Sequence, residues 1–235
     1  MEEKYERLEA LMNAVGLTAE EVISYCQQKL KQKGSKKLSV KELTIVNPKF
    51  PESDIRSQTK LFWYAFEGKK FSPDPKAYPN CQGVVGWINP APNAPEGKRI
   101  YVVLPKQQYL QYSTRYCLTG ADDLYDGRAN TKKLIEYGKK HYVCFPAAEL
   151  AFNYCENGVK QGEAFLPAIG QLSLVARNCV GVRKALKLIG GTFEGWLWSS
   201  SELSDSGAWC VSSDAGIMGS GTKNHAKSVS CFLAY

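Results

Sequence analysis

Segment 216–223 brings together glycines, a threonine and a lysine, the residue types that bind phosphate in nucleotide-binding loops. Such a loop needs its lysine directly after the last glycine and a hydroxyl residue after the lysine, at the start of a helix. In this segment Thr222 precedes Lys223, and no helix-forming run follows. The sequence therefore predicts no phosphate-binding loop.

The hydroxyl, imidazole and carboxylate side chains form no recognisable catalytic or metal-binding set. A nucleophile elbow has the pattern G-x-S-x-G between a strand and a helix. Gly219-Ser220-Gly221 does not match it, and only His141 and His225 could serve as a base. The acidic residues of segment 122–126 lack the ligand spacing of a calcium loop, so we interpret them as turn and helix-capping residues. We expect a protein that is not an enzyme and that uses no cofactor and no metal.

Tryptophan supplies the remaining candidate chemistry, because an indole can stack on a sugar ring. Trp196, Trp198 and Trp209 all lie in the C-terminal region. Trp198 and Trp209 fall within its hydrophobic islands, and we interpret these two as core residues of a scaffold.

Composition narrows the class of protein. The chain has 235 residues, 44% of them hydrophobic and 23% charged, which suits one large globular domain or one domain with an appendage. The net charge of +7 is moderate and lysine is spread along the chain, which argues against a nucleic-acid partner. The eight cysteines form no C-x-x-C pair. We expect reduced thiols that act as small buried hydrophobic groups, with disulfides formed after release as the alternative.

The N-terminal segment shows no targeting signal. Met1–Lys4 is charged and no apolar h-region follows, and no apolar run is long enough to span a membrane. We therefore expect a chain made in the cytoplasm, without a signal peptide and without membrane contact.

Residues 1–54 are predicted to form a helical hairpin and a connector. Apolar residues recur at helical spacing from Tyr5 to Val15, and Thr18–Glu21 is a capping box that opens a second helix. The apolar stripe of these helices needs a partner, which is the main domain, a second copy of the chain or a larger assembly.

Residues 55–235 are expected to form the main domain. The predicted strands cover residues 61–66, 83–88, 99–104, 195–202, 208–211 and 229–235, and the predicted helices cover residues 131–137, 147–154, 169–175 and 182–189. The second and third strands form a hairpin with a long loop. This order predicts an α+β fold with short antiparallel strands, two or more helices and paired terminal strands.

Between the last three predicted strands nearly every residue is small or polar. Segments 203–207, 212–216 and 219–222 favour turns and exposed loops. Loops that a rigid scaffold displays commonly form binding sites. The alternative is an ordinary Gly/Ser-rich surface of a β domain.

Several local motifs occur in an order that resembles one family. They are Asp126–Thr131, Phe165–Leu172, Ala185–Gly191, Leu197–Glu202, Ala208-Trp209 and Phe232–Tyr235. The set resembles the C-type-lectin-like domains of bacterial adhesins, collagen-like surface proteins and phage tail proteins, and it covers residues from about 82 to 235. The resemblance implies a C-type-lectin-like fold. The calcium and sugar signatures of animal C-type lectins are missing, so calcium-dependent sugar binding is not implied.

Within this family the chain most resembles the variable proteins of diversity-generating retroelements, in which adenine-directed mutagenesis of Asn codons changes exposed residues. Residues that this mutagenesis cannot reach, namely Trp209, Met218, Lys223 and Lys227, would be fixed scaffold. The implied ligand-binding residues are all reachable from an Asn codon: Ser204, Asp205, Ser206, Gly207, Cys210, Ser212, Asp214, Ile217, Gly219, Ser220, Thr222, Asn224, His225 and Ala226.

The resemblance implies a display scaffold in a phage tail or on a bacterial surface after release. It would bind a bacterial cell-surface protein or glycan through residues 203–230, while residues 1–54 would attach it to virion tail components or form a homo-oligomer. The alternative is a fixed-specificity adhesin module that binds glycan or a collagen-like polymer. A third hypothesis is an enzyme of the formylglycine-generating type that uses Cys210.

Overall fold

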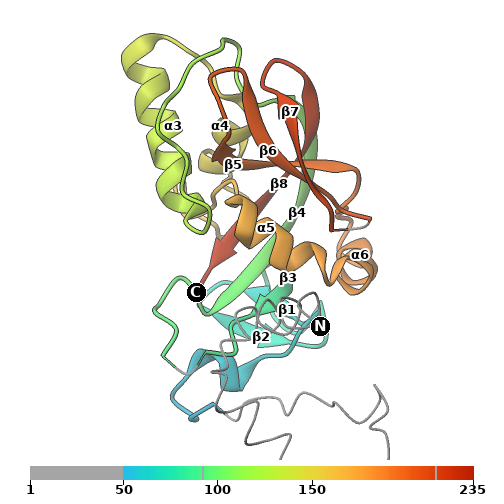
Figure 1. Cartoon of the computed structure of the whole chain (residues 1–235). Helices are drawn as coiled ribbons and strands as arrows, with labels where there is room; N and C mark the ends of the chain where they lie inside the picture. The colour runs from blue at the N-terminus through green and yellow to red at the C-terminus, as the bar shows by residue number, and fades with distance from the viewer. Residues whose placement is uncertain (1–49, 92, 215) are drawn as a thin grey trace, which may run out of the picture.

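The computed structural model describes residues 50–91, 93–214 and 216–235. The predicted helical hairpin and most of its connector lie outside the described residues. The described part is a mixed α/β structure, in which four α-helices and one short 3-10 helix accompany a single eight-stranded sheet (Figure 1).

Strands come first, helices follow and strands complete the chain, which is the order that the sequence predicts, and each group of strands has four members where three were predicted. The strands are β1 (Tyr64–Phe66), β2 (Lys70–Ser72), β3 (Cys81–Ile88), β4 (Ile100–Gln111), β5 (Trp196–Glu202), β6 (Gly207–Ser212), β7 (Met218–Thr222) and β8 (Ala226–Ala234). The helices are α3 (Gly127–His141), α4 (Pro146–Phe152), α5 (Ile169–Ala176) and α6 (Cys179–Lys187), and the 3-10 helix η2 spans Ile55–Gln58.

The sheet has the order β2-β1-β3-β4-β8-β5-β6-β7. All neighbours are antiparallel except β5 and β8, which are parallel. The predicted hairpin of β3 and β4 is confirmed. The predicted pairing of the terminal strands is wrong, because β8 lies between β4 and β5 and two strands separate it from β1.

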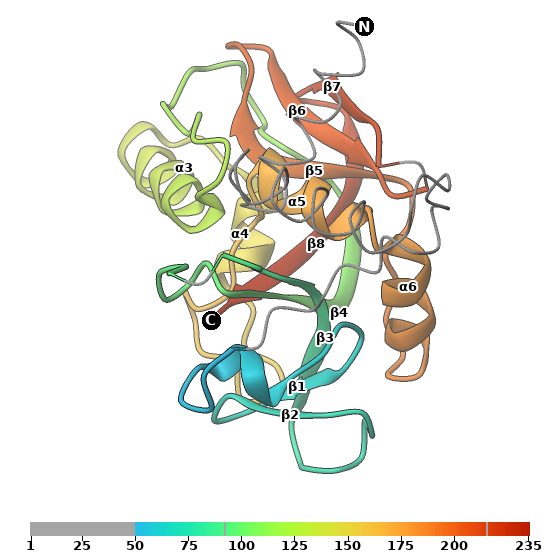
Figure 2. The ribbon, with the colours of Figure 1, turned by 60° about the horizontal axis from the view of Figure 1, so that its bottom comes forward.

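The alternation of apolar residues along β8 explains why helices cover both faces of the sheet. Cys231 and Leu233 belong to one buried cluster, and Phe232 between them belongs to a second. Successive side chains of a strand point to opposite faces, so both faces must be covered. The first cluster contains residues of α3 and α4, and the second contains residues of α5 and α6. Figure 2 shows α3 and α6 on opposite sides of the strands.

Several elements are longer than predicted, and strand β4 and helix α3 differ most. Strand β4 continues past Pro105 to Gln111. Its pairing with β8 shifts register between Val103 and Gln107, so Pro105 lies where the two strands are not paired and its missing N–H interrupts no hydrogen bond of the sheet. Helix α3 begins at Gly127, because the side chain of Asp126 accepts a hydrogen bond from the Ala129 amide at 2.9 Å and caps the helix. Residues 127–130, which precede the predicted helix of residues 131–137, therefore form the first turn of α3.

Two short strands, β2 and β7, are missing from the sequence prediction. Residues 219–222 were expected to form a loop but pair with β6 over the whole length of β7. Two glycines in five residues weaken the intrinsic strand preference. The neighbouring strand and the side chains packed on the glycines override that preference.

The motifs that carry the family resemblance meet in a buried polar cluster. Asn130, fully buried in α3, donates from Nδ2 to the Asp123 carbonyl at 2.6 Å and to Ser200 Oγ at 3.3 Å. Its Oδ1 accepts from the Asp123 amide at 3.1 Å. Ser201 Oγ also donates to the Asp123 carbonyl, at 2.7 Å, and accepts from the Ile169 amide at 3.1 Å. These motifs therefore fix α3, α5 and β5 to one another in the interior.

The start of α3 lies so close to segment 166–168 that only glycine fits there. A Cβ at Gly127 would come within 2.5 Å of the Ala168 nitrogen and the Leu166 carbonyl oxygen. The close approach lets Gln171 Oε1 accept from the amides of Gly127 at 2.9 Å and Ala168 at 3.0 Å. The glycine is required by packing rather than by backbone conformation.

Replacing Asn130 by alanine should lower the free energy of unfolding by about 2–3 kcal/mol, because it leaves the amide of Asp123 without its buried partner and leaves the carbonyl of Asp123 with Ser201 Oγ alone. Chemical denaturation followed by circular dichroism measures this. Lys132→Ala, on the exposed side of the same helix, is the control and should leave stability nearly unchanged. Equal stability of the Asn130→Ala protein and the parent would contradict the assignment.

Candidate binding surface

Three loops lie side by side at one end of the sheet, and we call residues 113–120, 203–206 and 223–225 together the loop end. The Cys117 amide donates to the Asp205 carbonyl at 3.1 Å, and the Lys223 amide donates to the Ser206 carbonyl at 2.9 Å. The Ser113 amide donates to the Lys223 carbonyl at 3.1 Å. The loops gather at the top of Figure 1. Backbone hydrogen bonds between them make the loop end one continuous surface.

Large apolar side chains of the loop end are open to solvent. Tyr116 is 51% exposed, Leu118 is 62% exposed and Leu203 is 49% exposed. Asp205, Asn224 and His225 add polar groups beside them and are also exposed. A cluster of exposed apolar groups with a polar rim is typical of an interaction site.

A buried ion pair lies directly beneath these loops. Lys223 and Glu202 have side-chain exposures of 0% and 1%, and Lys223 Nζ lies 2.6 Å from Glu202 Oε1. Lys223 Nζ also donates to the Cys117 carbonyl at 2.6 Å. The pair therefore connects the end of β5, the turn after β7 and the first loop.

The second carboxylate oxygen of Glu202 holds the loop that precedes α3. Glu202 Oε2 accepts from the Thr119 amide at 2.8 Å, from the Thr119 hydroxyl at 2.9 Å and from the Gly120 amide at 3.1 Å. It also accepts from the Ala121 amide at 3.3 Å. A buried carboxylate needs this many donors, since an unpaired charge in the interior is costly.

Tyr112 completes the base of the loop end. Its ring lies 5.5 Å from Lys223 Nζ and packs edge-to-face on Trp198 at 5.7 Å between centroids. Its hydroxyl donates to the Ser200 carbonyl at 2.9 Å. Burial, and secondly the charge of Glu202, raise the pKa of Tyr112 well above its usual value. The phenol therefore stays neutral and acts as a donor.

The structure places most of the predicted ligand-binding residues at the loop end or on the strand positions next to it. These are Ser204, Asp205, Ser206, Gly207, Thr222, Asn224, His225 and Ala226. The turn of Ser204–Gly207 is closed by a hydrogen bond from the Gly207 amide to Ser204 Oγ at 2.9 Å.

The other predicted residues lie elsewhere. Ser212, Asp214 and Ile217 belong to the opposite end of the β6–β7 hairpin, where Arg183 of α6 pairs with Asp214. Gly219 and Ser220 lie within β7 rather than in a loop. Cys210 is fully buried in β6, so the expectation that its side chain contacts a ligand is wrong. Burial also raises the pKa of the Cys210 thiol.

The residues expected to be fixed scaffold have different environments. Trp198 is fully buried, as predicted, and its indole N–H donates to the Leu110 carbonyl at 3.1 Å. Trp209 is half-buried against the second cluster. Lys223 is fully buried. Met218 is 58% exposed at the start of β7, and its role as a fixed position stays a prediction.

Sequence reasoning missed the first loop of this surface. Tyr116 and Leu118 lie in a stretch that was assigned to no element and lies far from the C-terminal segment in the sequence. Their only signal is a pair of large apolar residues flanking Cys117 in an otherwise polar stretch. The contact between this loop and residues 203–206 depends on the sheet order, which the sequence does not reveal.

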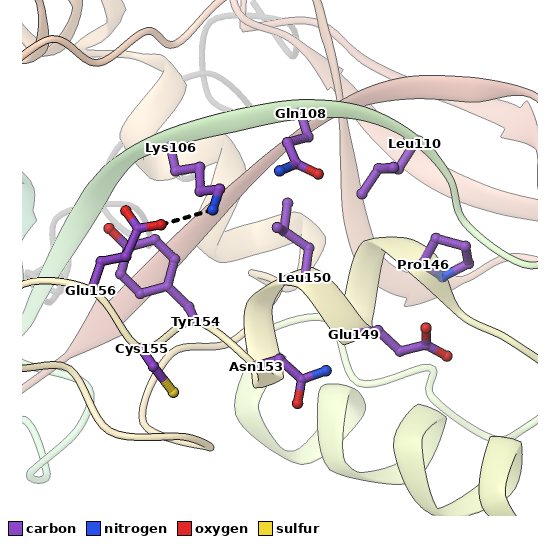
Figure 3. Close-up of a pocket in the computed structure, with 10 residues that line it drawn as sticks. All are labelled: Lys106, Gln108, Leu110, Pro146, Glu149, Leu150, Asn153, Tyr154, Cys155 and Glu156. Carbon is purple, nitrogen blue, oxygen red and sulfur yellow. Dashed lines mark hydrogen bonds and ion pairs between the residues drawn. The ribbon is translucent and has the colours of Figure 1, made fainter.

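Two hollows in the described part of the chain lie away from the predicted residues. One of about 330 Å³ lies between β4 and α4, with the ion pair of Lys106 and Glu156 at 2.7 Å on its wall (Figure 3). The other, of about 470 Å³, lies between α3 and α4 and is lined by Tyr142 and Phe152 among others. None of the predicted ligand-binding residues lines either hollow.

The described residues contain no group of three or more His, Cys, Asp or Glu side chains placed to hold a metal ion. Their seven cysteines are free. Cys179, Cys210 and Cys231 are buried as predicted, whereas Cys144 and Cys155 are exposed, contrary to the expectation. Burial raises the pKa of Cys231 to about 12. No helix among the described residues is long and apolar enough to cross a membrane.

Comparisons with known proteins show similarity at the level of the fold. No family model and no curated protein matches the chain. The structure is similar to the crystal structure of a fimbrial protein from Bacteroides ovatus ATCC 8483, with a TM-score of 0.56 and 15% sequence identity. The similarity covers 75% of this chain and 49% of the fimbrial protein, so this chain spans about half the length of that structure.

Lys223→Met should lower the free energy of unfolding by about 3–5 kcal/mol, because it leaves the Glu202 carboxylate buried without its cation. Denaturant unfolding measures the change. Lys106→Met removes a half-exposed ion pair of similar geometry and should cost far less. If the two substitutions have equal effects, the buried pair does not anchor the loop end.

Proposed function

We propose that this chain is a non-enzymatic recognition protein that binds a protein or glycan on a bacterial cell surface through the loop end. The observation that carries the proposal is the exposure of Tyr116, Leu118 and Leu203 directly above the buried pair of Glu202 and Lys223. Exposed apolar clusters mark interaction sites. Because the buried pair of Glu202 and Lys223 holds the loops in place before binding, less conformational entropy is lost when a ligand binds.

We also propose that the fold is C-type-lectin-like and that the loop end is diversified. Ser204, Asp205, Ser206, Asn224 and His225, all reachable from an Asn codon, lie in the exposed or half-buried loops. Lys223 lies between them in sequence, cannot be reached from an Asn codon and is fully buried. The residues that are reachable from an Asn codon thus lie in the loops, and the residue that is not reachable lies buried beneath them, which supports the proposal.

Residues 1–54 would attach the protein to virion tail components or form a homo-oligomer, so the protein would act in a phage virion or on a bacterial surface after release. The residues of the loop end that are reachable from an Asn codon are mostly small and add little contact area to that of Tyr116, Leu118 and Leu203 in each copy. Several copies on one particle would raise the overall strength of attachment through multivalency.

A second candidate is a fixed-specificity adhesin module that binds glycan or a collagen-like polymer. The fold similarity to a fimbrial protein supports this candidate. The third hypothesis, an enzyme that uses Cys210, receives no support from this thiol, because it is buried and its pKa is raised.

Binding to a panel of intact bacterial strains, measured by flow cytometry with fluorescently labelled protein, tests the loop end. We expect the parent protein to bind at least one strain. Leu118→Ser should weaken that binding by about tenfold or more, because it removes an exposed apolar contact of the loop end.

Leu188→Ser is the matched control, because Leu188 is 72% exposed at the end of α6, away from the loops. It should leave binding unchanged. A parent protein that binds no strain, or equal losses in the two variants, would contradict the proposed surface.

The DNA directly downstream of the coding sequence tests diversification. We expect an imperfect copy of the last codons that differs from them mainly at adenines, together with a nearby reverse transcriptase gene. The positions that differ should include the codons of Asp205 and His225 and should leave Lys223 unchanged. Absence of such a copy would favour the fixed-specificity adhesin.

A further inference from the structure

A second surface lies on strands β5, β7 and β8, where Trp196 is at the end of β5 away from the loop end and Lys227 lies two residues after His225. Trp196 begins β5 and is 44% exposed, although Trp198 two residues later is fully buried. A Cβ on Gly219 would lie 2.9 Å from Cζ3 of Trp196, so the indole rests directly on the backbone of β7. The glycine gives the ring a flat support and leaves part of the ring open to solvent.

Lys227 lies on the same face and packs in the same way. A Cβ on Gly221 would clash with Cε of Lys227, so the lysine stem crosses β7 where that strand has no side chain. The Lys227 ammonium lies 5.9 Å from the ring centroid of Trp196 and 5.2 Å from that of Trp198. Trp196, Lys227 and the two glycines form one surface, which we call the indole–ammonium platform.

The ammonium of Lys227 has no carboxylate partner among the described residues, and it lies near the two indole rings, the backbone of Gly221 and the Cys210 thiol. Lys223, four residues earlier, is buried and forms an ion pair with Glu202, whereas Lys227 forms no ion pair with a carboxylate among the described residues. The negative faces of the rings hold the cation in place without neutralising it. A positive charge fixed beside an open aromatic ring is complementary to a ligand that carries an anion next to an apolar face.

We propose that the indole–ammonium platform binds an acidic sugar, in particular the hexuronate units of an acidic polysaccharide. The C–H face of the pyranose ring would stack on the open face of Trp196, whose quadrupole attracts polarised C–H groups. The ring carboxylate would accept a charge-assisted hydrogen bond from Lys227 Nζ. Neutral sugars would keep the stacking contact and lose the ionic one.

The experiment compares an oligogalacturonate with the same oligomer after methyl esterification, which removes the charges and keeps the sugar rings. Binding is measured by titration in the NMR spectrum, with the indole N–H signal of Trp196 as the local readout. We expect the acidic oligomer to shift that signal and to bind at least about tenfold more tightly than its ester.

Substitutions separate the two contacts. Trp196→Ala and Lys227→Met should each weaken binding of the acidic oligomer by about tenfold, whereas Trp196→Phe and Lys227→Arg should retain most of it. Gly219→Val keeps both side chains but displaces the indole from β7, and it should also weaken binding. Thermal unfolding of each variant shows whether it remains folded.

Two control variants test whether the effect is local. Tyr109→Ala changes a 73% exposed aromatic residue on β4, next to the position that pairs with Lys227 and therefore on the other face of the strand. Leu118→Ser changes the loop end. Both should leave oligomer binding unchanged, so failure of the loop-end proposal and failure of this one are distinguishable.

Any of four results would overturn the proposal. The parent protein could bind neither oligomer, it could bind the acid and the ester equally, or folded Trp196→Ala and Lys227→Met proteins could bind as tightly as the parent. Binding that depends on Lys227 but not on Trp196 would indicate general attraction to polyanions and would also overturn the assignment of a sugar site.

Discussion

The ammonium of Lys223 and the carboxylate of Glu202 meet where three loops converge, and both charges are shut off from solvent. A buried charge costs several kcal/mol unless it is paired and hydrogen-bonded. The pair meets this requirement only when the Cys117 carbonyl and the amides of residues 119–121 are also in place. If these loop groups were displaced, a charge in the interior would lose its hydrogen-bond partners. The ion pair therefore determines where the loops above it lie.

Because the buried ion pair holds the loops in place, the residues that maintain the fold differ from the residues that are exposed on its surface. Side chains of Asn130, Gln171, Ser200 and Ser201 face inward and bond across their segments, so the side chains of residues 204–206 and 224–225 have no duty in this buried network. Loops without such a duty can change in sequence at little cost to stability. The indole–ammonium platform differs, because Trp196 and Lys227 depend on the missing side chains of Gly219 and Gly221. The same sheet therefore carries the loop end, which tolerates amino-acid substitutions, and the indole–ammonium platform, which does not.

Periodicity in the sequence was sufficient to predict the helices and the buried strands, because apolar residues at fixed spacing must face a core. It also identified Trp198 as core. It failed for β7, whose glycines suggest a loop until the side chains of Trp196 and Lys227 are seen to pack on Gly219 and Gly221. The codon argument failed for Cys210, because the face on which its side chain lies depends on the register of β6 with its neighbours. The loop of Tyr116 was missed because long-range sheet order brings it to the C-terminal loops.

A display library selected for protease resistance tests the central claim most directly. One pool randomises residues 204–206 and 224–226, and a second randomises residues 202 and 223. If a buried ion pair supports tolerant loops, folded members of the first pool will contain most amino acids at every position. Folded members of the second pool will then retain Glu202 with Lys223, or replace the two together. Equal tolerance in the two pools would contradict the account.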